Sequence, residues 1–268
     1  MRPKARARLR ALARTVLPPL VAFGALAGGW QLLALHNSTI LPTIGQIADA
    51  LAHNKELYAK DTAETLLETV VGLSMGLGAA LVIGVAMSQV RLVQRALMPL
   101  LVVMNVTPLI ALAPGLVVAL GIGLVPKYVV AAIIVFFPFL INFSTGLVSV
   151  EAGALEVLRS IGASRREVLL RLQLPSSLPF LFAAARICFP LSLVGAVVAE
   201  LTVSGLSPGL GVEIAYASTN SEYAKLYGAV VCLAFVGTCL FGLVVVTERR
   251  SLGWYRATRG ALGPTTER

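Results

Sequence analysis

The stretch KYVVAAIIVFFPFLINFSTGLVSV, residues Lys127–Val150, decides the fold class, because its only charged side chain stands at the first position. A helix rises ~1.5 Å per residue, so about 20 apolar residues cross the hydrocarbon core of a bilayer. Inside lipid the backbone must satisfy its own hydrogen bonds. A continuous apolar run does this as a helix, whereas barrel strands alternate apolar and polar side chains. The stretch therefore predicts a transmembrane helix.

Five similar runs lie on either side of this stretch. They span Val16–Leu35, Glu64–Val90, Leu97–Leu120, Leu178–Ser204 and Ala224–Thr247. The chain is 57% hydrophobic and 13% charged, with a mean hydropathy of +0.85, whereas a soluble domain carries about 25% charged residues. Its charged side chains are too few to cover a soluble globule. We therefore predict an all-helical integral membrane protein, with six transmembrane helices in one domain of residues 16–247.

The lysine and arginine residues predict the orientation of these helices. Of the 22 basic residues, 17 fall in segments on one side of the membrane, four on the other, and Arg186 alone within a span. The four are Lys55, Lys60, Lys127 and Lys225. Because cytoplasmic segments carry the excess of basic residues, the tails 1–15 and 248–268 and the loop 151–177 are expected in the cytoplasm. The net charge of +9 does not indicate nucleic-acid binding, since the basic residues alternate with apolar runs.

The cytoplasmic loop contains EAGALEVLRSIGASRREVLLRLQLP, residues 151–175, a pattern that predicts a helix, a turn and a second helix. The first helix is expected over Ala152–Ile161. Gly162 is expected to take the left-handed conformation that ends it. The apolar residues on one side of this helix are Leu155, Leu158 and Ile161.

Ser164 is expected to cap the second helix of the loop, with Glu167 three residues later as its capping-box partner. Pro175 is expected to break the chain before the next span. The apolar stripe of this helix consists of Val168, Leu169 and Leu172. On the residues alone, two interpretations stay open: the helix pair docks into a groove of a partner protein, or it lies on lipid headgroups, which its four arginines would also suit.

An outer segment, Thr43–Lys60, has apolar residues at helical spacing and is expected to form an amphipathic helix on the outer membrane surface. Those residues are Ile44, Ile47, Ala48 and Leu51.

The cytoplasmic loop resembles the EAA motif of binding-protein-dependent ABC importer permeases. That motif is a glutamate-led segment followed by a glycine, nine residues, an aliphatic residue, one residue and Leu-Pro. Here Glu156 leads and Gly162 stands six residues on, followed at the family spacing by Leu172, Leu174 and Pro175. Aliphatic residues replace the usual alanines after the glutamate. The position of the loop, between the fourth and fifth predicted spans on the inner side, matches the family as well.

Further stretches resemble the nitrate/sulfonate/taurine-type branch of this family. They are LPTIGQIADAL beginning at Leu41, the stretch 107–142, and AEL ending at Leu201 with GLG at Gly209–Gly211. Three substrate classes stay open on this resemblance: nitrate, a sulfonate such as taurine, and a heterocyclic vitamin precursor such as a pyrimidine or riboflavin.

The resemblance implies a non-catalytic type I importer permease in a bacterial inner membrane. Two copies, as a homodimer, would form the pathway for a small solute that a substrate-binding protein delivers. Two separate ATPase subunits would bind ATP and Mg²⁺. No cofactor is expected on this chain, because none of its five lysines precedes Ser or Thr as a phosphate-binding loop requires. The residues expected to couple to the ATPase are Glu156, Ser160, Gly162, Ala163, Ser164, Leu172, Leu174 and Pro175.

Ionisable residues at membrane depth are functional candidates, because lipid makes them costly. Glu200, near the outer end of the fifth span, and Arg186, earlier in the same span, are the two clearest. Each is expected either to line or gate the pathway or to tie buried helices together. Glu64 and Glu68 begin the second span and are interpreted as flanking charges.

The sequence GLSMG, Gly72–Gly76, fits the G-x-S-x-G pattern of serine hydrolases, but it lies inside an apolar run, and both histidines, His36 and His53, are in the outer loop. Its small residues four apart predict close helix packing instead. A secondary transporter is the main rival class. It would favour inverted repeats and several ionisable groups at the bilayer midplane, and the sequence has neither.

Overall fold

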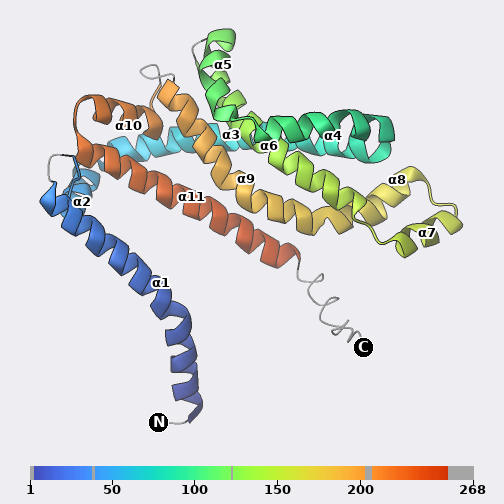
Figure 1. The fold of residues 1–268 in the computed structure, drawn as a ribbon, viewed down its shortest axis with the longest axis horizontal. Coiled ribbons are helices and arrows are strands. Elements are labelled where there is room, and N and C mark those ends of the chain that lie inside the picture. The colour runs from blue at the N-terminus through green and yellow to red at the C-terminus, as the bar shows by residue number, and fades with distance from the viewer. Residues whose placement is uncertain (1–2, 38–39, 122, 203–206, 253–268) are drawn as a thin grey trace.

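The computed structural model describes residues 3–37, 40–121, 123–202 and 207–252, and every regular element in these ranges is a helix. In chain order they are α1 (Pro3–His36), α2 (Ile44–His53), α3 (Lys55–Gln89), α4 (Arg91–Val106), a 3₁₀ turn η1 (Leu109–Leu112), α5 (Ala113–Leu120), α6 (Leu124–Val148), α7 (Ala152–Ser160), α8 (Arg165–Val168), a π-helical turn η2 (Leu169–Gln173), α9 (Leu174–Thr202), α10 (Leu210–Thr219) and α11 (Tyr223–Ser251). Figure 1 shows their arrangement as an elongated bundle. The all-helical prediction is confirmed for the described part of the chain.

Five helical segments in the described ranges are long and apolar enough to cross a membrane: Leu17–His36, Lys55–Gln89, Leu124–Val148, Arg165–Thr202 and Tyr223–Ser251. They correspond to five of the six predicted spans.

The remaining predicted span, Leu97–Leu120, is not one continuous helix. Helix α4 ends at Val106, Thr107 is extended (φ −68°, ψ 133°), and α5 starts afresh at Ala113. Pro108 explains the break, because a proline pushes the residue before it out of the helical region. Pro114 stands in the first turn of α5, where its missing N–H costs no intrahelical hydrogen bond.

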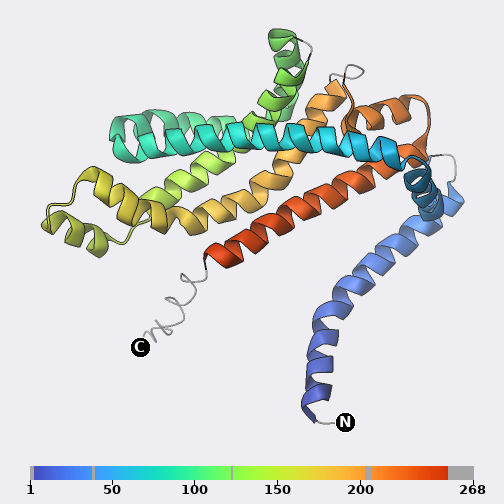
Figure 2. The same ribbon diagram turned by 180° about the vertical axis from the view of Figure 1, so that it is seen from behind.

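The core of the bundle lies where α3, α6 and α9 pack along one another. Its largest cluster of buried side chains includes Met87, Phe139, Leu140 and Phe143. Figure 2 shows α3, in cyan, running along the bundle from α2 to α4. A β-carbon added to Gly76 would lie 2.5 Å from the carbonyl oxygen of Ala132 on α6. The GLSMG segment is therefore a close helix contact, as its small residues predict.

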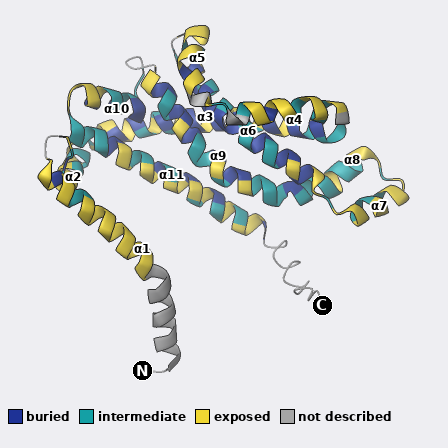
Figure 3. Cartoon of the chain, viewed as in Figure 1, coloured by how far each residue is buried: buried dark blue, intermediate teal, exposed yellow. Residues whose placement is uncertain are grey.

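Helix α1 projects away from this core, and the contacts that hold it lie near its C-terminal end (Figure 1). The Trp30 indole donates a hydrogen bond to the carbonyl oxygen of Pro42 (3.0 Å) and packs edge-on against Tyr227 of α11. Farther from this contact, Phe23 and Leu26 are about 70% exposed, within the exposed stretch of Figure 3. Such a surface suits contact with lipid or with another membrane protein.

The outer segment before α3 differs from its prediction. The amphipathic helix ends at His53, and residues from Lys55 onward already belong to α3, which begins nine positions before the predicted start of the second span at Glu64. Tyr58 explains the early start, because it is buried and its hydroxyl donates to the carbonyl oxygen of Lys225 on α11 (3.0 Å). At the other chain end, α11 reaches Ser251, and most of the predicted C-terminal tail lies outside the described residues.

Candidate functional site

The turn after α7 has the conformation that the sequence predicts. Gly162 has φ +75°, in the left-handed region that glycine adopts without a β-carbon clash. Its N–H donates to the carbonyl oxygen of Arg159 (3.0 Å), and the Ala163 N–H donates to that of Leu158 (3.0 Å). This pair of hydrogen bonds is a Schellman motif, which satisfies carbonyl groups at the end of a helix and fixes the direction of the chain after it.

A capping box begins the second helix of the loop, as predicted. The Glu167 N–H donates to the Ser164 hydroxyl (3.3 Å), while the Ser164 N–H donates to the Glu167 carboxylate (2.8 Å). The hydrogen bonds from the Ser164 backbone and hydroxyl lower the pKa of Glu167. Because the turn and the cap are both closed by local hydrogen bonds, α7 and α8 are joined with little freedom at residues 162–164.

The predicted break at Pro175 is wrong. Helix α8 continues through the π-helical turn into α9, and Pro175 occupies the second position of α9. The π-helical turn is wider than an α-helical one, so the Leu174 N–H donates to the carbonyl oxygen of Leu169, five residues back. A proline immediately after this turn is accommodated. Leu169 and Leu174 pack against the main core, and the Gln89 side chain on α3 donates to Gln173 (3.1 Å).

The two sides of α7 differ in exposure. Leu155 and Leu158 are half-buried, whereas Ile161, predicted to share their side, is 73% exposed. Val157 is exposed as well, and Glu156 lies in the same exposed stretch. Ser160 is exposed and donates to a carbonyl of its own helix. An exposed apolar and acidic face on a short, fixed helix is typical of a surface that a partner covers.

Of the other residues predicted to couple to the ATPase, Gly162 and Ser164 are exposed, and Ala163, Leu172, Leu174 and Pro175 are half-buried. The predicted set therefore divides into an outer group on α7 and the turn, and an inner group that anchors the loop to the bundle.

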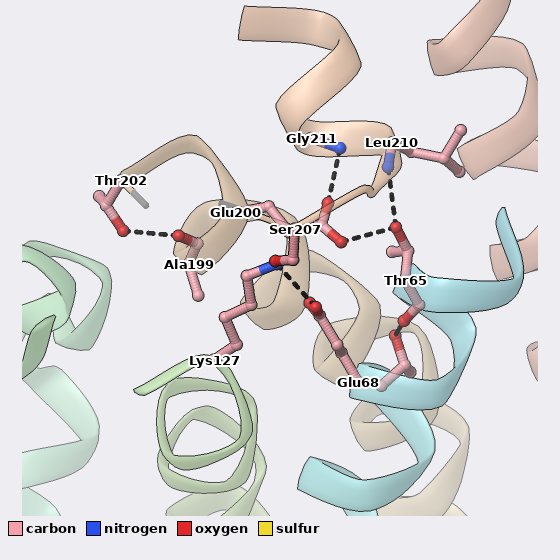
Figure 4. Close-up of polar contacts among 10 residues, drawn as sticks. Thr65, Glu68, Lys127, Ala199, Glu200, Thr202, Ser207, Leu210 and Gly211 are labelled. Carbon is pink, nitrogen blue, oxygen red and sulfur yellow. Dashed lines mark hydrogen bonds and ion pairs between the residues drawn. The ribbon is translucent and has the colours of Figure 1, made fainter. Parts of the chain in front are cut away.

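A second polar group lies at the other end of the bundle, fully buried between α3, α6 and the segment before α10 (Figure 4). The Lys127 ammonium donates to the Glu68 carboxylate (2.7 Å) and to the Ser207 hydroxyl (2.8 Å). The side chains of Lys127 and Glu68 are 0% and 1% exposed, respectively. The interpretation of Glu68 as a flanking charge is wrong. Lys127, counted among the basic residues of the outer segments, lies in the first turn of α6 with its side chain buried. Because α3 begins at Lys55, Glu68 lies in the fourth turn of the helix.

Glu200, one of the two pathway candidates, belongs to the same buried group. Its carboxylate accepts hydrogen bonds from the Thr65 hydroxyl (2.7 Å) and from the Gly211 N–H (2.6 Å), and Thr65 also accepts one from the Leu210 N–H (2.9 Å). The first N–H groups of α10 are thus satisfied by side chains of α3 and α9. A carboxylate at this end of a helix is favoured, because unpaired N–H groups give it partial positive charge.

The glycines of the GLG sequence make this contact possible. A β-carbon on Gly211 would lie 2.7 Å from the Glu200 carboxylate and 2.8 Å from the carbonyl oxygen of Val197, and one on Gly209 would also collide with Glu200. The sequences AEL and GLG, which carried part of the family resemblance, therefore meet in one structural unit.

Arg186, the other pathway candidate, is far from Glu200. Its guanidinium forms an ion pair with Glu248 near the end of α11 (2.6 Å), and the two side chains are 40% and 13% exposed. Fourteen residues separate Arg186 from Glu200 along α9, about 21 Å of helix. The structure therefore does not bring the two candidates into one site.

Comparison with known proteins agrees with this architecture. Residues 72–252 match the family model described as the inner membrane component of binding-protein-dependent transport systems. A probable ABC transporter permease protein of Haemophilus influenzae is 30% identical over 84% of this chain and 93% of its own length. The riboflavin transport system permease protein RibX of Chloroflexus aurantiacus is 31% identical over 92% of this chain and 94% of its own length. A solved structure of the MetNI methionine ABC transporter, in inward-facing conformations, shares the fold with a TM-score of 0.63 at 20% identity. It covers 74% of this chain and 97% of the matched one.

The chain therefore belongs to the binding-protein-dependent transport family of inner-membrane components. It is a multi-pass permease subunit of an ABC importer, without catalytic activity of its own, and separate subunits hydrolyse the ATP. The family predicted from the EAA-like loop is confirmed.

Proposed function

We propose that the loop 151–177 is the element through which the ATPase subunits drive this permease. The exposed residues Glu156, Val157 and Ile161 supply the docking face, and the inner residues Leu172, Leu174 and Pro175 join that face to the bundle. The observation that carries the proposal is the continuous helical path from Arg165 to Thr202. A push on the loop would be transmitted along α9 because the helix is unbroken to Thr202, although Pro179 and Pro190 lie inside it.

The far end of α9 explains what such a push would move. Glu200 lies there and accepts a hydrogen bond from the Gly211 N–H in the first turn of α10. A tilt of α9 would therefore carry α10 with it, in the manner of the rigid-body changes by which packed helices switch between two arrangements. We propose that ATP-driven closure of the ATPases uses this connection to alternate the pathway between inward-facing and outward-facing states.

For Glu200 and Arg186 we propose structural roles in place of direct contact with the solute. Glu200 is 0% exposed and its two oxygens accept hydrogen bonds from different helices. Arg186 is paired with Glu248, which ties α9 to α11.

We further propose six membrane crossings, with α4 and α5 together forming the sixth. The termini and the loop 151–177 would lie in the cytoplasm. The bias of basic residues supports this orientation.

The working assembly is proposed to contain two copies of this chain, two ATPase subunits that bind ATP and Mg²⁺, and an extracytoplasmic binding protein that delivers the solute. The exposed apolar side chains of α1 support a surface covered by lipid or by another membrane-embedded chain.

The proposal is tested by isolating the tagged permease from solubilised membranes and quantifying the ATPase that accompanies it. Glu156→Lys is expected to lose the ATPase while the permease stays in the membrane. Glu151→Lys is the matched control, because Glu151 is an exposed acid of the same loop outside the EAA-like pattern. Retention of a stoichiometric, active ATPase by Glu156→Lys would contradict the assignment of the loop.

A further inference from the structure

A hollow of about 660 Å³ lies between the end of α3 and the loop, and of its lining residues only Ala163 belongs to the set expected to couple to the ATPase. Its walls include Gln89 and Val90 at the end of α3, and Leu155, Arg159 and Arg165 in the loop. The hollow is more than ten times larger than the ~30 Å³ that a water molecule occupies in the liquid, so it has room for a ligand.

The charged side chains that line the hollow are both basic. None of the side chains that line it is acidic, and two of them are arginines. Among the ion pairs formed by the described residues, none includes Arg159 or Arg165. Guanidinium groups bind phosphate oxygens through paired N–H donors. Two unpaired guanidinium groups on one hollow therefore favour a phosphate-bearing anion.

The walls also carry apolar side chains. Val90, Leu155 and Val168 line the same hollow as the two arginines. The apolar part of α3 ends at Met87, three residues before Val90, so we place the hollow near the depth where α3 would leave the bilayer. A small soluble anion gains nothing from contact with apolar side chains. An amphiphile can place its headgroup on the arginines and its glycerol and first acyl carbons on the aliphatic side chains.

The side of α7 that faces the hollow is not the proposed docking side. Leu155 and Arg159 are four residues apart and share one side of the helix, and Val157 and Ile161 are four apart and share another. At about 100° per residue, the two pairs are directed roughly 200° apart around the axis. Glu156, the third docking residue, is directed between the two sides, about 80° from the first pair and 120° from the second. An ATPase that covers Val157, Ile161 and Glu156 therefore leaves the side of Leu155 and Arg159 open.

We propose that this hollow binds the headgroup of an anionic phospholipid of the cytoplasmic leaflet. The phosphate lies between Arg159 and Arg165, and the lipid holds the loop against the end of α3. The proposal rests on the proposed function for the cytoplasmic position of the loop. Basic pockets beside transmembrane helices on this side of a membrane are suited to anionic headgroups.

The test uses the complete permease–ATPase complex in detergent, freed of lipid and titrated with phosphatidylglycerol, with native mass spectrometry to count bound lipids. An arginine placed at an anionic headgroup strengthens binding about five-fold, so Arg159→Gln/Arg165→Gln, which removes both arginines of the hollow, is expected to bind phosphatidylglycerol about 25-fold more weakly. Arg249→Gln/Arg250→Gln is the matched control, because it removes the same charge from exposed residues at the end of α11. This control is expected to bind as the unmodified complex does.

Several outcomes would overturn the proposal. The first is that Arg249→Gln/Arg250→Gln weakens phosphatidylglycerol binding as much as Arg159→Gln/Arg165→Gln does. The second is that the complex retains phosphatidylcholine as well as it retains phosphatidylglycerol. The third is that millimolar inorganic phosphate displaces the lipid, which would indicate a free-anion site. Lipid that binds only after the ATPase is removed would mean that the ATPase fills the hollow. The same spectra count the ATPase subunits, so a permease that retains lipid but no ATPase would refute the proposed function and leave the lipid site standing.

Discussion

The buried pair Glu68–Lys127 offers the sharpest test of the structure. Both side chains are at most 1% exposed, and the second oxygen of Glu68 has no hydrogen-bond partner among the residues that the structure describes. Removing one member of a buried ion pair leaves an uncompensated charge and costs about 3–5 kcal/mol. For a protein of this size 1 kcal/mol shifts Tm by roughly 2–4 °C, so a loss on the order of 10 °C is expected for either single variant.

The two single variants are not equivalent. Glu200 is a second carboxylate with an electrostatic influence on Glu68, and Lys127 is the cation that both face. Lys127→Met leaves two carboxylates without a cation, whereas Glu68→Gln leaves Lys127 beside Glu200. We therefore expect Lys127→Met to be the more destabilising change. Glu68→Met/Lys127→Met is expected to recover most of the loss, because replacing a buried pair by apolar side chains is often close to neutral.

The measurement is thermal unfolding of the purified chain in one detergent at one scan rate, since unfolding of such proteins is commonly irreversible. Lys55→Met/Glu56→Gln is the matched control, because it changes the same residue types at the exposed start of α3. The reasoning fails if either single variant shifts Tm by no more than the control. It also fails if the double variant loses the sum of the two single effects, since an interacting pair is not additive.

Three further outcomes are expected. Gly211→Ala pushes a β-carbon against the Glu200 carboxylate and should lower the free energy of unfolding by about 1–3 kcal/mol in the same assay. Gly115→Ala, whose β-carbon would meet nothing within 4 Å, should leave it unchanged, and equal stability of the two variants would contradict the contact. Arg186→Gln should cost no more than about 1 kcal/mol, because its ion pair is 40% exposed on the arginine side, and a loss several times larger would mean a buried role. The folded-state pKa of Glu167 is lowered, so its cap stabilises the loop above the unfolded-state pKa, and this contribution is lost as the pH falls through the folded value; hydrogen exchange of the Ser164 amide should report that loss, and Glu167→Gln should abolish the pH dependence.

The loop was the most predictable part of the site, because its signals are local. Gly162 and the Ser164–Glu167 pair each act within five residues, and the structure has both as predicted. Pro175 was misjudged, because the rule that a proline breaks a helix takes no account of a π-helical turn immediately before it. The family followed from the loop pattern, and the comparisons confirm it. The coupling role of the loop, the six crossings and the homodimer stay predictions.

The buried polar group was hidden by its long-range pairing. Glu68 and Lys127 are 59 residues apart, and each stands at the edge of an apolar run, where hydropathy reads a charged residue as a boundary. Glu68 could have been recognised by its position on the helix, since it shares a face with Thr65 and Gly72, both buried. Which cation it would meet depends on how α6 packs against α3, and that is decided by side-chain fit across the whole contact.

The span Leu97–Leu120 shows the limit of hydropathy for a different reason. Its apolar content is that of a membrane helix, yet Thr107 is extended and the chain changes direction there. Apolarity is a property of composition, whereas continuity depends on the backbone at single positions such as Pro108.

The spacing of the buried charges along the chain has a consequence for how the protein is made. Glu68 leaves the ribosome well before Lys127, and Glu200 follows more than 70 residues later. Until α6 arrives, α3 must enter the bilayer with a carboxyl group that has no cation, and a charged residue in an inserting helix opposes insertion by up to about 3 kcal/mol, the value at the helix centre. Nascent chains released before Lys127 should therefore insert α3 incompletely, and synthesis of α6 would be the step that commits the first half of the molecule to the membrane.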